Sequence, residues 1–368
     1  AGNDDIPELG AIRNYFGDAG NDTLRVSSAI NSDLHDGGSG NDWIDFSNSG
    51  ENGLEIDLTA ELVTDTNANT EQMISFENAI GTAGDDTVTD AVTENNELIL
   101  GAGNDLVNHL GGLNEDGDTI TGGGGNDTVA QTGSGWSFNF FGGAGRDTAD
   151  FSGTTYGTLG MLVDLATETY DYLYTSTRTA YGASFDIQSV ENVFGSNEHD
   201  NLFGDGADNI FLGNDGDDSI NGRGGADTIN GGLGNDTIIG GLGDDVIAGA
   251  QGADSMFGNN GRDTLSYSAS NAGINITLET GANTGGHAQG DFITGFERIV
   301  GSAFADTIDA NSRNLTTVEA GGGNDRIIGG ANTQTMRGQG GNDTITAYAG
   351  ANFNSTSVAD FLDGGSGS

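Results

Sequence analysis

A nine-residue repeat runs without a gap from Gly213 to Ser266. Its six copies read GNDGDDSIN, GRGGADTIN, GGLGNDTII, GGLGDDVIA, GAQGADSMF and GNNGRDTLS, with Gly at positions 1 and 4, Asp at position 6 and an apolar residue at position 8. One apolar residue in nine cannot build an amphipathic helix, which needs an apolar residue every three or four positions. The repeat instead predicts short strands that point position 8 inward, joined by turns in which Gly adopts positive φ.

Strands and turns of constant length predict a solenoid whose core is a stack of position-8 residues. Apolar residues make up only 34% of the 368-residue chain, which contains 66 Gly, so this core is thin. The chain has no Cys, and disulfide bonds therefore cannot supplement the core. A second stabilising interaction is required in the turns.

The charge of the chain restricts its partners. There are 56 acidic residues against 10 basic ones, all of them Arg, and the net charge is -46. Such a chain repels nucleic acid and anionic membranes, and it repels itself unless cations neutralise it. It contains no apolar run of the ~18 residues typical of a membrane-spanning helix. We therefore expect neither a nucleic-acid partner nor membrane insertion.

The nonads resemble the calcium-binding nonapeptide repeat of secreted RTX proteins, G-G-x-G-x-D-x-U-x. This resemblance implies an all-β fold, a right-handed parallel β-roll or β-helix solenoid. In that family the position-6 Asp and backbone carbonyls coordinate Ca²⁺, and each ion lies between stacked turns. Turns that are rich in Gly, offer oxygen ligands and lack His and Cys suit Ca²⁺ well.

The resemblance assigns multiple Ca²⁺ ions to the position-6 Asp residues of the nonads and of looser copies elsewhere. These residues are Asp22, Asp42, Asp86, Asp105, Asp118, Asp127, Asp147, Asp200, Asp208, Asp218, Asp227, Asp236, Asp245, Asp254, Asp263, Asp306, Asp325 and Asp343. The alternative for each of them is an Asx turn, in which Asp caps its own backbone. In the nonad GGANTQTMR, Gln334 replaces the Asp, which weakens the case for an ion there.

Two other features of the turns have competing explanations. Further acids are either outer ligands or solvated charges, and we favour solvation for most of them: Asp18, Asp85, Asp205, Asp217 and Asp244. The NDT triplets match N-glycosylation sequons. The tolerance of Asn for turn conformations explains the Asn at position 5 better than glycosylation does.

Three longer segments interrupt the nonads and resemble one another. The first two segments follow DFS and the third follows SYS. In chain order, each contains an alternating strand, GLEIDL, GMLVDL or GINITL, and ends in FENAIG, VENVFG or FERIVG. The alternation of Leu54, Ile56 and Leu58 with acids predicts a half-buried strand. We expect wider coils on the solenoid rather than separate domains, because segments this short bury little core. The expected divisions are nonads with an irregular segment at 1–45, excursion 1 at 46–80, nonads at 81–150, excursion 2 at 151–194, contiguous nonads at 195–266, excursion 3 at 267–300, and nonads at 301–368.

Excursion 2 holds five of the eight Tyr residues: Tyr156, Tyr170, Tyr172, Tyr174 and Tyr181. They predict either a strand pair with its own aromatic packing or an exposed contact surface for a partner. The four His residues (His35, His109, His199 and His287) are scattered, and the chain lacks Lys, Cys and a G-x-S-x-G motif. We therefore expect no enzyme activity.

These features favour an extracellular, secreted structural region that folds and stiffens on binding Ca²⁺. It would belong to a bacterial cell-surface or matrix assembly of the S-layer or adhesin type. The RTX resemblance adds export by type I secretion. The alternative is the RTX region of a secreted toxin or enzyme, such as a protease, lipase or alginate epimerase, with its active domain outside this chain.

Besides calcium, the candidate partners are copies of the chain and cell-surface polysaccharide, the latter bound by the excursions. Both ends of the chain fall within repeats, so we expect a piece of a longer array.

Overall fold

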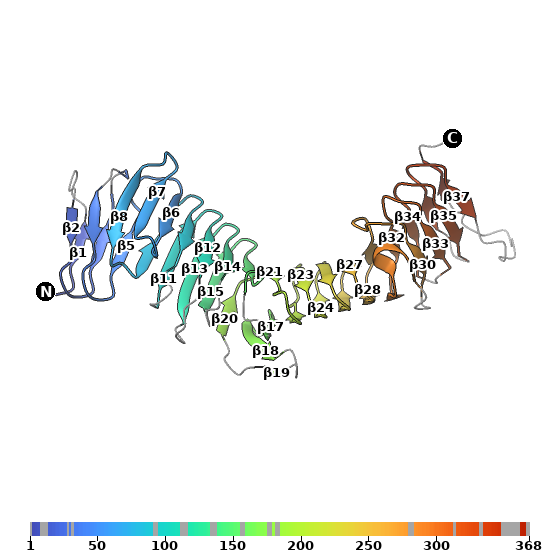
Figure 1. Ribbon diagram of the computed structural model, residues 1–368, viewed down its shortest axis with the longest axis horizontal. Coiled ribbons are helices and arrows are strands. Elements are labelled where there is room, and N and C mark those ends of the chain that lie inside the picture. Colours follow the sequence, from blue (N-terminus) through green and yellow to red (C-terminus); the bar gives the residue numbers. More distant parts are fainter. Residues whose placement is uncertain are drawn as a thin grey trace. The chain divides into compact units, whose positions relative to one another are not determined.

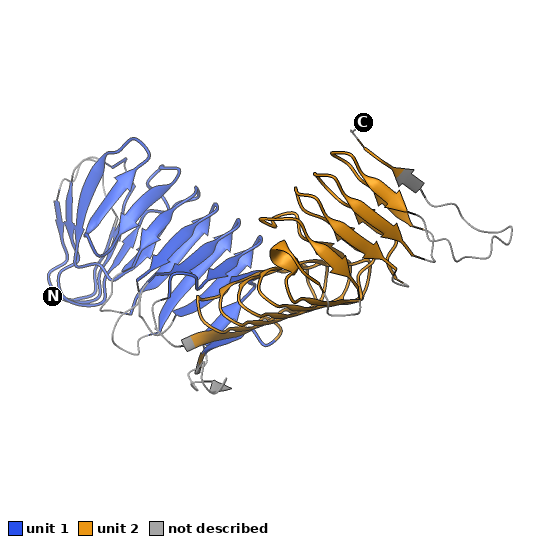
Figure 2. Cartoon of the chain, turned by 45° about the vertical axis from the view of Figure 1, so that its right-hand side comes forward, with its two compact units in different colours: residues 1–158, 167–172, 180–194 blue, residues 159–166, 173–179, 195–368 orange. Residues whose placement is uncertain are grey.

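A computed structural model describes residues 2–7, 14–27, 29–30, 33–90, 95–110, 117–132, 138–154, 159–174, 179–180, 185–278, 283–311, 314–330, 334–346 and 361–365. Figure 2 shows two compact units: unit 1 comprises 1–158, 167–172 and 180–194, and unit 2 comprises 159–166, 173–179 and 195–368. Within the described residues each unit is a stack of short strands, and the one helix is the 3₁₀ turn η1 (Gly286–Ala288). No helix in this part of the chain is long and apolar enough to cross a membrane.

Unit 1 has two faces of parallel strands. In stacking order, the first face consists of β1 (Asp5–Pro7), β3 (Thr23–Arg25), β5 (Trp43–Asp45), β9 (Asn78–Ile80), β11 (Glu97–Ala102), β13 (Asp118–Gly124), β15 (Phe138–Ala144) and β20 (Phe185–Gln188). The second face contains two parallel runs: β2 (Asn14–Phe16), β4 (Leu34–Asp36) and β8 (Thr70–Ile74), then β6 (Leu54–Asp57), β10 (Thr87–Thr89), β12 (Leu106–His109), β14 (Thr128–Gln131), β16 (Thr148–Asp150) and β21 (Asn192–Phe194). β7 (Leu62–Asp65) pairs antiparallel with both β6 and β8 and so connects these runs.

Unit 2 repeats this arrangement. One face consists of β17 (Leu159–Asp164), β22 (Asn201–Phe203), β24 (Ser219–Gly224), β26 (Thr237–Leu242), β28 (Ser255–Asn260) and β31 (Phe292–Thr294). The other consists of β23 (Ile210–Asp215), β25 (Thr228–Leu233), β27 (Val246–Gln251), β29 (Thr264–Ser266), β32 (Arg298–Val300), β34 (Thr317–Glu319), β36 (Thr335–Arg337) and β38 (Phe361–Asp363). A third, shorter sheet consists of β30 (Asn275–Thr277), β33 (Thr307–Ala310), β35 (Arg326–Gly329) and β37 (Thr344–Thr346).

Two nonads make one coil. Ile220 of β24 lies opposite Ile238 of β26, whereas the nonad between them places Ile229 of β25 opposite Ile247 of β27. Alternate nonads therefore build two parallel sheets, which Figure 1 shows as successive rungs from β23 to β28.

The position-8 residues form the core between these sheets. In the contiguous block their side chains are at most 1% exposed: Ile220, Ile229, Ile238, Ile247, Met256 and Leu265. The predicted all-β, parallel solenoid with a thin apolar stack is thus confirmed.

Glycine at positions 1 and 4 is required by the close approach of the coils. A Cβ on Gly231 would lie 2.2 Å from Oδ2 of Asp236, and one on Gly234 would lie 1.8 Å from the carbonyl oxygen of Gly216. Gly234 also has a φ of +132°, which residues with side chains rarely adopt. The stacking distance therefore leaves no room for a side chain at Gly231 or Gly234.

Each excursion joins the stack through its first strand. β6 pairs in parallel with β10, β17 with β22, and β30 with β33. Ile56 lies opposite Val88 and Ile276 opposite Ile308, and all four side chains are at most 1% exposed. The alternating strands predicted at the starts of the first and third excursions are therefore present as layers of the stack.

The Tyr-rich excursion packs two aromatic side chains inward. Tyr170 and Tyr172 lie on β18 (Thr169–Tyr174), which is followed by β19 (Thr179–Ala180), and each is 1% exposed. The ring centroid of Tyr170 lies 5.3 Å from that of Phe138, and its hydroxyl donates to the Phe138 carbonyl at 2.9 Å. This confirms the predicted internal packing for Tyr170 and Tyr172. The side chains of the other three lie outside the described part of the chain: Tyr156, Tyr174 and Tyr181.

A core truncation tests the position-8 stack. Ile238→Ala should lower the free energy of unfolding of the calcium-loaded chain by about 2–5 kcal/mol, because it removes a buried side chain from a thin core. The matched change Val246→Ala, at a side chain that is 40% exposed, should cost far less. Urea unfolding followed by circular dichroism compares the two; equal losses would contradict the assignment of the core.

Candidate calcium-binding turns

Buried Asp side chains connect successive coils along the turns. The backbone N–H of Asp218 donates to Oδ1 of Asp236 at 2.8 Å, and that of Asp236 donates to Oδ1 of Asp254 at 2.9 Å. The alternate nonads form a second ladder, in which the N–H of Asp227 donates to Oδ1 of Asp245 at 2.9 Å. One oxygen of each carboxylate therefore holds the backbone of the preceding coil through a charge-assisted hydrogen bond.

The other carboxylate oxygen, Oδ2, is buried and accepts no hydrogen bond from any described residue in thirteen of these side chains. They are Asp22, Asp42, Asp105, Asp127, Asp147, Asp218, Asp227, Asp236, Asp245, Asp254, Asp263, Asp325 and Asp343. A buried carboxylate oxygen without a partner is costly, and native proteins keep few such groups. A cation beside each Oδ2 would remove this cost.

The residue at position 2 has positive φ in all thirteen of these turns: Asp18, Gly38, Gly101, Gly123, Gly143, Asn214, Arg223, Gly232, Gly241, Ala250, Asn259, Gly321 and Gln339. The φ values include +65° at Arg223 and +66° at Ala250, although such residues avoid this region. In these turns the N–H of position 2 makes no hydrogen bond to Oδ2, which stays open to an ion.

Burial raises the pKa of several of these carboxyls. Desolvation, with a smaller contribution from Asp200 in the preceding coil, raises the pKa of Asp218 to about 9. Desolvation also raises the pKa of Asp105 and of Asp254 to about 7, and acids in neighbouring coils add to the shift. A carboxylate in such an environment favours either a proton or a bound cation.

The residues at position 5 form a further ladder of hydrogen bonds, on the exposed side of the turns, in which the later coil donates to the earlier one. The N–H of Asn235 donates to Oδ1 of Asp217 at 2.8 Å, and the N–H of Ala253 donates to Oδ1 of Asn235 at 2.9 Å. Asp85 and Asp244 accept backbone N–H groups in the same way. Asn and Asp at position 5 therefore have a structural role in the turn. Of the remaining turn acids, Asp18 is exposed and Asp205 half-buried.

Three predicted ligands are buried but differ in their hydrogen bonds. The Oδ2 atoms of Asp86, Asp200 and Asp306 accept backbone N–H groups from within their own nonads, at 2.6, 2.7 and 2.7 Å. These three turns consequently form a separate class.

Asp208 does not occupy the sixth position, which corrects its assignment as a ligand by analogy with the other nonads. Asp208 is exposed, and the buried neighbour Asn209 occupies the sixth position counted from Gly204. The N–H of Asn209 donates to Oδ1 of Asp227 at 2.8 Å, and its own Oδ1 accepts the N–H of Asp205 at 3.2 Å. The prediction chose Asp208 because it is acidic, although the neutral Asn209, one residue later, occupies the sixth position.

Gln334 fills its turn with its own hydrogen bonds. Its Oε1 accepts the N–H of Gly330 at 2.7 Å, and its Nε2 donates to the carbonyl of Ala310 at 2.7 Å. The side-chain amide thus supplies both a donor and an acceptor inside this turn, in keeping with the doubt raised by the sequence.

Sequence reasoning missed four acids that continue the ladders: Glu77, Glu191, Asp291 and Glu297. The N–H of Asp263 donates to Oε2 of Glu297 at 2.9 Å, and that of Asp254 donates to Oδ1 of Asp291 at 2.9 Å. The three Glu residues end the excursions, within the motifs FEN, VEN and FER. That shared Glu was a usable signal, but only the structure brings it beside an Asp 34 to 44 residues earlier.

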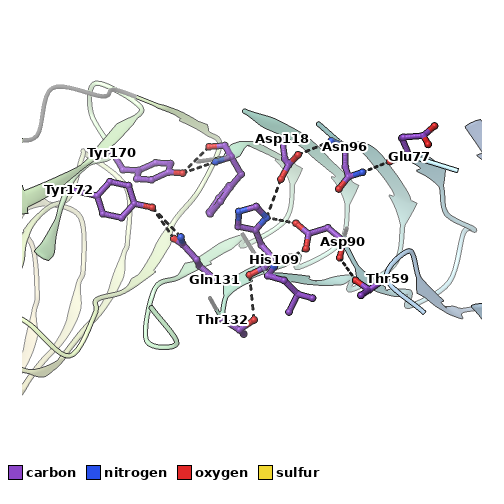
Figure 3. Close-up of polar contacts among 12 residues, drawn as sticks. Thr59, Glu77, Asp90, Asn96, His109, Asp118, Gln131, Thr132, Tyr170 and Tyr172 are labelled. Atoms are coloured by element: carbon purple, nitrogen blue, oxygen red, sulfur yellow. Dashed lines mark hydrogen bonds and ion pairs between the residues drawn. The ribbon is translucent and has the colours of Figure 1, made fainter. Parts of the chain in front are cut away.

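Asp118 lies in a buried cluster with His109 and Asp90, shown in Figure 3. Nδ1 of His109 contacts Asp90 directly and lies 3.4 Å from Oδ2 of Asp118, whose Oδ1 accepts the N–H of Asn96 at 2.7 Å. The imidazole therefore occupies the side of Asp118 that is open in the thirteen turns. Ca²⁺ prefers oxygen ligands, so this cluster suits it less than those turns do.

The thirteen open turns fit Ca²⁺ on the chemistry of their donors. Each offers a buried carboxylate oxygen, and Gly-rich backbone can supply carbonyl oxygens to a hard cation that takes about six to eight of them. The ion would neutralise carboxylates that burial brings together, which is electrostatic work that the chain's ten Arg residues cannot do for 56 acids.

Comparison with known families finds a calcium-binding repeat family. A family model described as the RTX calcium-binding nonapeptide repeat (4 copies) matches residues 114–130, 194–229, 203–238, 230–265, 293–312, 317–345 and 329–353. A search of curated proteins finds no match. The nonapeptide repeats of this family bind Ca²⁺ at multiple sites. The ladders of buried Asp, the parallel coils and this match together identify the matched segments as RTX calcium-binding nonapeptide repeats, within a parallel β-solenoid like the RTX β-roll.

Proposed function

We propose that this chain is an extracellular structural region that folds and stiffens when Ca²⁺ binds after secretion, within a bacterial cell-surface or matrix assembly. The observation that carries the proposal is the set of thirteen buried, unpartnered Oδ2 atoms aligned along the turns. The Asp residues that bear them would be the protein's side-chain ligands for Ca²⁺.

Electrostatics makes the fold conditional on the ion. Without a cation, the net charge of -46 and the desolvated carboxylates oppose folding, and a thin core does little to offset the entropy of ordering the chain. Ca²⁺ that binds the folded turns and not the unfolded chain contributes its binding free energy to folding. Extracellular modules commonly bind Ca²⁺ with dissociation constants of about 0.1–1 mM. Such a chain would therefore fold outside the cell rather than inside it.

A structural role is supported by the modular construction of the chain. Each of the three excursions enters the stack through a parallel strand, so the whole described chain is organised as layers. RTX repeats are typical of secreted proteins. We propose copies of the same chain or cell-surface polysaccharide as partners, as in an S-layer or adhesin. Electron microscopy of the calcium-loaded chain should then show sheets or filaments, whereas isolated particles would contradict self-assembly.

Calcium removal tests the coupling of the ion to folding. In EGTA the far-ultraviolet circular dichroism should be that of a largely unfolded chain, and millimolar Ca²⁺ should restore a β spectrum. Mg²⁺ at the same concentration serves as the control, because it demands a tighter octahedral shell and dehydrates reluctantly. A folded, unchanged spectrum in EGTA would overturn calcium-dependent folding.

A point variant tests the ladder carboxylates as ligands. Asp236→Asn keeps an oxygen that can accept the backbone hydrogen bond but removes the charge, so it should raise the Ca²⁺ concentration at the folding midpoint several-fold. Asp208→Asn removes the same charge from an exposed side chain and should leave the midpoint nearly unchanged. Calcium titration followed by circular dichroism distinguishes them; equal midpoints for both variants would count against Asp236 as a ligand.

The pH dependence of the calcium-free chain tests the electrostatic argument. Burial raises the pKa of Asp105 and Asp254 from the ordinary 3.8 to about 7, and that of Asp218 to about 9. A raised pKa means that the folded state binds more protons, so its stability is greatest below about pH 4 and falls as the pH rises through 7 to 9. In EGTA, lowering the pH from 8 to 5 should therefore increase β structure. Loss of β structure on this acidification would contradict the argument.

A further inference from the structure

Each excursion returns to the stack at a turn that has Ser or Thr at position 2. The residues are Thr82, Ser196 and Ser302, in the nonads that begin GTAGDDT, GSNEHDN and GSAFADT. All three are buried, with at most 5% of their surface exposed. Their turns contain Asp86, Asp200 and Asp306, the three ladder residues whose Oδ2 atoms are already hydrogen-bonded.

The turn of Ser302 shows the arrangement in full. The N–H of Ser302 donates to Oδ2 of Asp306 at 2.7 Å, and its hydroxyl donates to Oδ1 at 2.7 Å. The same hydroxyl accepts the N–H of Phe304 at 3.0 Å, which fixes its orientation. Oδ1 also accepts the N–H of Ile274, which directly precedes β30 of the excursion, at 2.9 Å. Both oxygens of this carboxylate therefore have protein donors.

The other two turns repeat these four hydrogen bonds. Around Asp200, the N–H and hydroxyl of Ser196 donate at 2.7 and 2.8 Å, and the N–H of Met161 donates at 2.5 Å. Around Asp86, the N–H and hydroxyl of Thr82 donate at 2.6 and 3.0 Å. The N–H of Leu54, from the excursion, donates at 2.7 Å. In both turns the hydroxyl accepts an N–H two residues ahead, at 3.2 and 3.1 Å.

The backbone at position 2 separates these turns from the open ones. Position 2 has positive φ in the thirteen open turns, but Thr82, Ser196 and Ser302 are not among the described residues with positive φ. Their N–H groups consequently point at Oδ2, and the hydrogen of each occupies the direction from which a cation would bind. Burial still raises the pKa of Asp306, and the Ser302 donors act against that shift by stabilising the charged form.

We propose that the turns of Asp86, Asp200 and Asp306 bind no Ca²⁺, and that their Ser or Thr residue holds each excursion on the stack through protein hydrogen bonds alone. The inference rests on the proposed role of the open turns as calcium sites. A Ca²⁺ ion binds oxygen at about 2.3–2.6 Å and would have to displace an N–H that already lies within hydrogen-bond distance of Oδ2. An ion is not required at these carboxylates, because backbone N–H and hydroxyl donors offset the cost of burying their charge.

The entry to each excursion is fixed by a carboxylate as well. The Glu that ends the excursion accepts the N–H of the last ladder Asp before it, at 2.7 Å for Asp42 and 2.8 Å for Asp147. Two hydrogen bonds between a carboxylate and the backbone therefore hold each excursion. In the first, the terminal Glu accepts the N–H of the ladder Asp before the excursion. In the second, the ladder Asp after the excursion accepts an N–H at the start of the excursion's first strand. The second of these contacts would persist when the concentration of Ca²⁺ falls.

Anomalous scattering from crystals of the full chain grown in Ca²⁺ tests the proposal directly. We expect peaks within bonding distance of the open Oδ2 atoms, and none within bonding distance of Asp86, Asp200 or Asp306. Peaks at these three residues as well as at the open turns would overturn the inference and leave the proposed function intact. Absence of peaks at every turn would overturn both.

Two sets of variants provide a solution test by native mass spectrometry in Ca²⁺. Ser302→Gly combined with Phe304→Gly restores the open G-G-x-G-x-D pattern, so it should bind more Ca²⁺ than the parent chain; an unchanged count would contradict the inference. The triple change of Thr82, Ser196 and Ser302 to Ala should lower the melting temperature by several degrees without changing the ion count. Ser268→Ala, at an exposed hydroxyl, is the control. A triple variant that loses ions would show that these turns hold Ca²⁺.

Discussion

The structure depends on the buried carboxylate of the position-6 Asp, whose two oxygens have different roles. One oxygen of the position-6 Asp accepts the backbone N–H of the preceding coil, as Asp236 does from Asp218 at 2.8 Å. Within the contiguous nonad block this hydrogen bond stacks the coils with an offset of eighteen residues. The other oxygen is left in a low-dielectric turn without a donor, and its desolvation is too costly for a thin core to offset. The same group that aligns the coils therefore creates the requirement for a cation.

Two chemical solutions to that requirement occur in one chain. In the open turns, positive φ at position 2 leaves Oδ2 without a donor, and the solution that we propose there is a bound ion. In the turns of Asp86, Asp200 and Asp306, Ser or Thr at position 2 provides the missing donors. The residue at position 2, four places before the Asp, has positive φ in the open turns and is Ser or Thr in the other three. The distribution is not random along the chain, because the second solution coincides with the return of each excursion.

The nonad pattern was sufficient to predict most of this architecture. Gly at positions 1 and 4 and an apolar residue at position 8 leave few alternatives to a coil of two strands and two turns, and the burial of Ile238 and Met256 confirms that interpretation. The excursions were harder to interpret. Alternation predicted the strand at Leu54–Asp57, but not its antiparallel pairing with β7, because pairing partners are chosen by the fold and not by local periodicity.

Errors in the candidate site arose where composition and position disagree. Asp208 was predicted as a ligand because it is acidic, but Asn209 occupies the position in the ladder. The register counted from Gly204, and not the charge, determines which side chain is buried. Glu297 was overlooked because it lies outside any nonad, although the excursion brings its carboxylate to the N–H of Asp263.

The sequence by itself determined the period, the inward-facing residues and a charge that demands cations, because these follow from spacing and composition. Only the tertiary structure decided which carboxylate oxygens are left without a donor, because that depends on backbone φ at position 2 and on donors from coils that are distant in the chain.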